Sequence, residues 1–228
     1  MAIPVVIIVV PSQGKDTGGC QASAVTLNKE LYGGNAVIVK TTVAEEIIKK
    51  APAVPVNALG MPTQWGGLPA QTVDTFENQV TVSFNTLKGN HPFRWENWYN
   101  LSRVVMITHG ATSDGPNLAY KDPSLSDSAK QPWGTVPDGN KHRTQLSPAA
   151  SAFWSLVGKA VRADGMIILL GCNVGRDEYA LLVSELTKKN VYAPKDYCSA
   201  GNPPTALKQV KGIESQKLLT PMMRFTPK

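Results

Sequence analysis

The hydrophobic positions of the chain fall into short continuous runs, separated by stretches with helical spacing. Four runs are apolar almost without interruption, which is typical of strands buried on both faces. They cover Pro4–Val10, Ala36–Val39, Arg103–Thr108 and Met166–Leu170, and a short fifth strand is predicted at Asn190–Ala193. A sheet made of such strands needs helices to cover it.

Apolar residues three and four positions apart mark the helices between these strands. One predicted helix buries Cys20, Ala24, Leu27 and Leu31 and ends at Gly33-Gly34. A second begins at Ser147-Pro148 and buries Phe153, Leu156, Val157 and Ala160. A third carries Tyr179, Leu182, Val183 and Leu186. The pair Asp164-Gly165 is predicted to turn the chain into the fourth strand. The alternation predicts an α/β fold: a three-layer sandwich with a mostly parallel sheet and helices on both faces.

Two segments interrupt this alternation without adding a second domain. Residues 51–70 are rich in proline and glycine and are predicted to form an insertion without regular structure. Residues 111–146 contain many turn formers and little periodicity, so they are predicted to be a long loop or lid. Before the first of these segments, a capping box at Thr42 and Glu45 predicts a short helix. Between the two, Val80 to Phe84 alternate as in a half-exposed strand. Residues 1–228 are expected to form one domain.

Charge and composition narrow the classes of partner. The 228 residues carry a formal net charge of +6, but the basic residues are scattered and not interleaved with aromatic ones, so no nucleic-acid binding is expected. The apolar run near the N-terminus is far too short for a membrane span, and no basic residue precedes it as in a secretory signal. The protein is expected to be cytoplasmic, or exported without a cleaved signal peptide, and to make no membrane contact.

The sequence carries no recognisable cofactor motif. The three cysteines have no CxxC spacing, so neither a disulfide framework nor a structural zinc site is predicted. A zinc site made of His109, Cys172 and Cys198 is disfavoured, and Gly14-Lys15 lacks the first glycine and the Ser/Thr of a phosphate-binding loop. No metal, nucleotide or other cofactor is therefore expected.

Chemically active residues follow two of the predicted strands. His109-Gly110 comes directly after the third strand, and Gly171-Cys172 directly after the fourth. Function in an open parallel sheet gathers at the carboxyl ends of strands, and a right-handed crossover would make these two strands neighbours, about 4.8 Å apart. The helix that follows Cys172, from Tyr179 to Leu186, would favour a thiolate at its N-terminus. The pattern predicts a Cys-His pair suited to nucleophilic catalysis.

Each cysteine and histidine also has a purely structural interpretation. A cysteine at a strand end commonly packs into the core, and a lone histidine can simply belong to a turn. The coincidence of both, each beside a glycine at the end of a strongly apolar strand, favours the dyad. Cys20 shares the apolar face of its helix and is predicted to be core. Cys198 follows the fifth strand and could line the cleft, but a loop thiol without function is the favoured interpretation.

The two motifs resemble those of the caspase-like superfamily of cysteine peptidases, which includes the clostripain-type and gingipain-type peptidases. In that superfamily a hydrophobic strand ending in His-Gly and a later strand ending in a small residue plus Cys supply the catalytic dyad; here these are Met106–Gly110 and Leu169–Cys172. The resemblance implies a caspase-like sheet, His109 as base or proton donor, and Cys172 as nucleophile. It also implies an oxyanion hole formed by the backbone N–H groups of Gly110 and Cys172.

The expected function is that of a cysteine endopeptidase, which hydrolyses a protein or peptide substrate through an acyl-enzyme on Cys172. Asp114, Asp177, Glu178 and Asp196 are candidates for an acidic substrate pocket, which would favour a basic residue before the cleaved bond. One alternative is a catalytically inactive caspase-like binding module. Another is an α/β hydrolase or transferase of small molecules that uses the same thiol.

Overall fold

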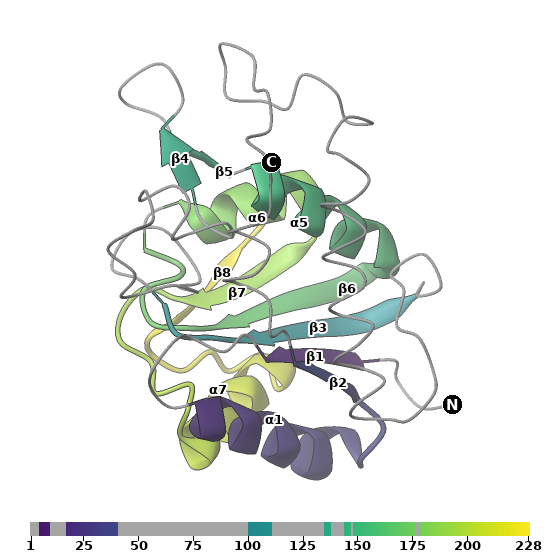
Figure 1. Ribbon diagram of the computed structural model, residues 1–228, viewed down its shortest axis with the longest axis vertical. Coiled ribbons are helices and arrows are strands. Elements are labelled where there is room, and N and C mark those ends of the chain that lie inside the picture. Colours follow the sequence, from purple (N-terminus) through teal and green to yellow (C-terminus); the bar gives the residue numbers. More distant parts are fainter. Residues whose placement is uncertain are drawn as a thin grey trace.

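The centre of the molecule is a six-stranded sheet, shown in the computed structural model of Figure 1. The structure describes residues 5–9, 17–40, 100–110, 135–137, 144–146, 148–176 and 178–228. The strands of the sheet are β1 (Val5–Val9), β2 (Val37–Lys40), β3 (Leu101–Ile107), β6 (Val161–Leu170), β7 (Asn190–Pro194) and β8 (Met222–Phe225). Their order is β2-β1-β3-β6-β7-β8; the first five are parallel, and β8 is antiparallel to β7.

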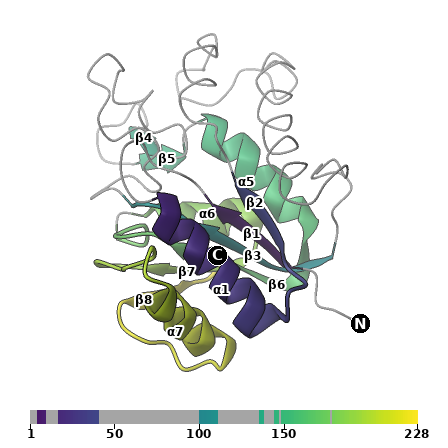
Figure 2. The same ribbon diagram turned by 60° about the horizontal axis from the view of Figure 1, so that its bottom comes forward.

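Helices cover both faces of this sheet. Helices α1 (Thr17–Tyr32) and α7 (Pro203–Glu214) lie together on one face, while α5 (Pro148–Ala160) and α6 (Tyr179–Thr187) lie on the other (Figure 1). Figure 2 turns the molecule so that α1 and α7 come forward. The three-layer α/β sandwich with a mostly parallel sheet, predicted from the alternation of strands and helices, is confirmed.

The strand β1 shows why these segments are apolar throughout. All five of its residues are buried, and neighbouring side chains point to opposite faces. Val6 and Ile8 pack into the core under α5 and α6, whereas Ile7 and its neighbours pack into the core under α1 and α7. A strand between two helical layers has no face for water, so it has no polar positions.

The start of β6 differs from the prediction. The strand begins at Val161 and not at Met166, because Leu101 pairs with Val161 before Arg103 pairs with Met166. The extra residues on β6 make an irregularity in the pairing, so the predicted turn at Asp164-Gly165 lies inside the strand. A hydrophobic pattern along β6 does not show how the neighbouring strand β3 pairs with it, so the sequence could not predict this irregularity.

The predicted long loop at residues 111–146 contains regular structure. Strands β4 (Thr135–Pro137) and β5 (Thr144–Leu146) pair antiparallel as a small separate ladder. Strands of three residues are too short to show an alternating pattern, so the sequence does not predict them. The rest of that segment, the insertion at 51–70, the predicted helix at Thr42 and the predicted strand at Val80 lie outside the described residues.

Two elements near the C-terminus were not predicted. Helix α7 opens with the cap Asn202 followed by two prolines and buries Ala206, Val210 and Ile213, which is a helical spacing that was present in the sequence. Strand β8 adds an antiparallel edge to the sheet. None of the helices that the structure describes is long and apolar enough to cross a membrane.

Candidate active site

The strands that carry the predicted dyad are direct neighbours. In the parallel pairing of β3 with β6, Ile107 lies beside Leu170, and the Thr108 N–H donates a 2.9 Å hydrogen bond to the Leu170 carbonyl oxygen. His109 and Cys172 each stand two residues beyond this register pair. No other strand separates them, as the sequence pattern predicted.

A close backbone contact joins the two segments just past the strands. A Cβ atom built on Gly110 would collide with the carbonyl oxygen of Cys172 and would come within 2.7 Å of its nitrogen. A Cβ on Gly171 would come within 2.8 Å of the Thr108 side chain. Glycine at positions 110 and 171 therefore lets the His109 and Cys172 segments approach each other.

A pocket of about 350 Å³ opens at this edge of the sheet. Its walls come from the ends of β3 and β6 and from the segment between β7 and α7. The lining residues are Thr108, His109, Cys172, Tyr197, Cys198, Ser199, Ala200, Gly201, Asn202 and Pro203. His109 and Cys172, both half-buried, thus face one cavity.

The Cys172 thiol is held by the main chain of Cys198. Its Sγ donates to the Cys198 carbonyl oxygen at 3.0 Å and accepts from the Cys198 N–H at 3.4 Å. Further hydrogen bonds join the two segments, including one from the Asn173 N–H to the Asp196 carbonyl oxygen at 3.1 Å. The segment after β7 is therefore fastened to the segment after β6.

One nitrogen of the His109 imidazole is buried. This atom, Nε2, has no hydrogen-bond partner in the part of the chain that the structure describes. A buried polar atom of this kind is uncommon, and such atoms are found where a proton is exchanged or a ligand binds.

Cys198 lies in the loop after β7, as predicted, and takes the place in the cleft that the sequence left open. It is part of the pocket wall, and only 3% of its surface is exposed. Burial, together with the nearby Cys172, raises the pKa of the Cys198 thiol to about 12, so it stays protonated near neutral pH. In the sequence, Cys198 follows the predicted strand that became β7, and β7 pairs with β6. A position after that strand indicated that Cys198 could lie at the same edge of the sheet as Cys172.

The helix end at the pocket belongs to α7 and not to α6. Asn202, the N-terminal cap of α7, and Pro203, its first residue, line the cavity, and the Asn202 Oδ1 accepts from the Thr205 N–H at 3.0 Å. Helix α6 begins only at Tyr179, after the turn that follows Cys172. The favourable end of a helix dipole at this pocket is thus that of α7.

Of the four acidic residues predicted for a substrate pocket, the two that the structure describes do not line this cavity. Asp114 and Asp177 lie outside the described residues. Glu178 and Asp196 are exposed and do not line the cavity, and the Asp196 carboxylate accepts from the Tyr197 N–H at 2.7 Å. An acidic substrate pocket stays a prediction.

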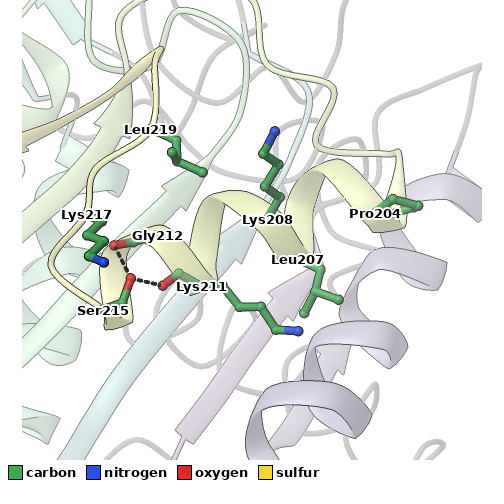
Figure 3. Close-up of a pocket in the computed structure, with 8 residues that line it drawn as sticks. All are labelled: Pro204, Leu207, Lys208, Lys211, Gly212, Ser215, Lys217 and Leu219. Atoms are coloured by element: carbon green, nitrogen blue, oxygen red, sulfur yellow. Dashed lines mark hydrogen bonds between the residues drawn. The ribbon is translucent and has the colours of Figure 1, made fainter.

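No group of three or more metal-ligating side chains occurs among the described residues. A second pocket, of about 450 Å³, lies along α7 (Figure 3). Lys208, Lys211 and Lys217 line it together with apolar residues, and the Ser215 hydroxyl in its wall donates to the Lys211 carbonyl oxygen at 2.8 Å. It contains neither a histidine nor a thiol, so the first pocket is the better candidate for a chemical site.

Comparisons with known proteins give few matches. No family model matches the chain, and no curated protein matches it. Among solved structures the chain is similar to a secreted C11 cysteine protease from Bacteroides thetaiotaomicron, determined in complex with an irreversible peptide inhibitor, with 8% identity and a TM-score of 0.41. The match covers 92% of this chain and 54% of that one, so the chain spans about half the length of that protease. A likeness this low says nothing about individual residues of the site.

Proposed function

We propose that the protein is a cysteine endopeptidase, with Cys172 as nucleophile and His109 as general base and acid. One observation carries the proposal: His109 and Cys172 each follow, by two residues, a register pair of adjacent parallel strands and line one pocket. The buried Nε2 of His109, which has no hydrogen-bond partner among the described residues, supports it, because that atom can receive the thiol proton.

The reaction would begin with a change of hydrogen bond at Cys172. The thiol proton, directed at the Cys198 carbonyl oxygen in this structure, passes to His109 Nε2. The thiolate attacks the substrate carbonyl carbon, and the leaving amine takes the proton back from His109. Water, deprotonated by His109, then attacks the acyl-enzyme and releases the acid and the free thiol.

The oxyanion would be stabilised by backbone donors. The N–H groups of Gly110 and Cys172 are the proposed pair, and the close contact between these two residues brings their main chains together. Such donors stabilise charge that develops only in the tetrahedral intermediate.

A catalytically inactive binding module is the second candidate. The observation that favours it is the hydrogen bond of the Cys172 thiol to the Cys198 carbonyl oxygen at 3.0 Å. A thiol that keeps this partner when a peptide enters the pocket is not deprotonated by His109.

The experiment compares wild-type protein with Cys172→Ala and Cys20→Ala on a peptide library. Cys20 is buried in the core with 1% of its surface exposed and does not line the pocket. We expect Cys172→Ala to lose at least about 10³-fold in kcat/KM because the nucleophile is gone, while Cys20→Ala retains activity. Normal turnover by a folded Cys172→Ala protein would rule out the dyad.

Thiol labelling separates the two candidates. An active dyad reacts with iodoacetamide selectively at Cys172, because Cys198 is buried and protonated. Replacing His109 by Ala should slow this labelling if His109 takes the thiol proton. A binding module would show no turnover of any library member and no effect of His109 on labelling. The library profile also tests whether a basic residue is preferred before the cleaved bond.

A further inference from the structure

Two cysteines meet in the wall of the candidate site. The Cys172 sulfur is in contact with both the carbonyl oxygen and the nitrogen of Cys198, at 3.0 and 3.4 Å. A contact between a sulfur and the main chain of a second cysteine is compatible with the separation, about 4.4–6.8 Å between Cα atoms, that disulfides span. None of the three cysteines forms a disulfide in this structure.

The two thiols differ in access. Cys172 is half-buried and faces the pocket, whereas Cys198 is almost completely buried. A small oxidant that enters the pocket therefore meets Cys172 first. Burial and the neighbouring Cys172 raise the pKa of Cys198 to about 12, which makes it a poor first target.

We propose that Cys172 and Cys198 form a redox-modification site, in which a peroxide converts the two thiols into a disulfide. As a regulatory device this rests on the proposed function, because a disulfide at Cys172 removes the nucleophile. As a chemical modification it depends only on the contact between the two residues.

The chemistry balances in two steps. The Cys172 thiolate attacks one peroxide oxygen; the O–O bond breaks, hydroxide leaves and takes up the thiol's proton as water, and Cys172 becomes a sulfenic acid. The Cys198 sulfur then attacks the Cys172 sulfur; the S–O bond breaks, the S–S bond forms, and the hydroxyl leaves with the Cys198 proton as a second water. Two thiols are oxidised by two electrons while one peroxide is reduced to two waters.

The pair would protect the site as well as switch it off. A sulfenic acid without a nearby thiol is oxidised further to sulfinic acid, which is irreversible for most proteins. Cys198 would capture the sulfenic acid first, and an external thiol would restore both cysteines by exchange.

The test treats the native protein with hydrogen peroxide at neutral pH, alkylates the remaining thiols and digests with trypsin. We expect a disulfide between the peptides Ala163–Arg176 and Asp196–Lys208, a loss of two hydrogen atoms in mass, and full reversal by dithiothreitol. This readout does not require peptidase activity. Its outcome and that of the turnover assay are therefore independent.

Two variants check the assignment. With Cys198→Ser, peroxide should leave Cys172 as sulfinic acid, so that dithiothreitol no longer recovers the thiol. With Cys20→Ala, the disulfide should form as in wild type. Finding Cys172 overoxidised in wild-type protein, a disulfide that involves Cys20, or no change between wild type and Cys198→Ser would each overturn the proposal. A linked pair without any measurable peptidase activity would leave the modification established and remove only its regulatory meaning.

Discussion

At the scale of single residues, Gly110 lets the backbone segments that carry His109 and Cys172 approach each other. The position sits one residue after His109, and its Cα lies against the main chain of Cys172. A side chain there would meet backbone atoms, which cannot rotate away as the end of a flexible side chain can. The smallest residue is required because the His109 and Cys172 segments must be close.

Replacing Gly110 by alanine should separate the two segments. We expect a loss of stability of several kcal/mol, or a displaced pocket with strongly reduced turnover. Urea unfolding and kcat/KM measure the two effects. Gly34→Ala is the matched control, since Gly34 has a positive φ of 78° and no atom of the described residues lies within 4 Å of the added Cβ. This variant should cost only about 1–2 kcal/mol of backbone strain. Equal effects of the two variants would contradict the packing explanation.

At the scale of elements, α7 is fixed to the sheet by an ion pair far from the pocket. Glu214, at the end of α7, accepts hydrogen bonds from Arg103 Nε at 2.8 Å and Nη2 at 2.9 Å, and Tyr32 of α1 donates to it at 3.5 Å. Burial alone lowers the pKa of Arg103, but the hydrogen bonds and charge of Glu214 outweigh it, so that pKa is raised. This contact holds the helix whose other end lines the cavity.

Replacing Glu214 by glutamine should destabilise the protein by about 1–3 kcal/mol. The reason is that Arg103, with 17% of its side chain exposed, would keep its charge but lose the carboxylate that is hydrogen-bonded to it. Glu30→Gln is the control, because the pair of Glu30 with Lys29 is exposed and 3.8 Å long; it should change stability by less than about 0.5 kcal/mol. Urea midpoints of the two variants measure the difference, and a Glu214→Gln protein as stable as wild type would refute this role.

At the scale of the whole molecule, buried phenol and thiol groups lower the stability of the folded state at alkaline pH. Burial raises the pKa of Tyr179, of Tyr32 and, to about 12, of Cys198. In the unfolded chain a thiol ionises at about 8.5 and a phenol at about 10. Between these values and the raised folded ones, only the unfolded chain loses protons, so stability falls as pH rises.

The free energy of unfolding should therefore be flat near pH 7–8 and fall above about pH 9. Each group that ionises only on unfolding adds a slope of about 1.4 kcal/mol per pH unit. Urea midpoints between pH 7 and 11 measure this, and Tyr179→Phe should give a shallower decline above pH 10, whatever its offset at neutral pH. A wild-type midpoint unchanged up to pH 11 would show that these groups do not control alkaline stability.

Much of the fold follows from local patterns. The apolar runs at Val5–Val9 and in β6 predict buried strands, because a strand covered on both faces has no polar positions. Helix α1 ends at Gly33 and Gly34, which both have positive φ as their type predicts. The dyad candidates were also visible in the sequence, because each follows directly after such a strand.

What only the tertiary structure decided is which strands and loops lie together. A hydrophobic pattern is the same for every order of strands, so it could not show that the segment after β7 brings Cys198 to Cys172. Nor could it show the irregular pairing at the start of β6, which depends on Leu101 in another strand. The acidic residues predicted for a substrate pocket illustrate the same limit: Glu178 and Asp196 are exposed and lie outside the cavity. Local pattern determines burial and periodicity along the chain, whereas pairing between distant residues determines the contents of the pocket, because such pairing depends on the packing of the whole sheet.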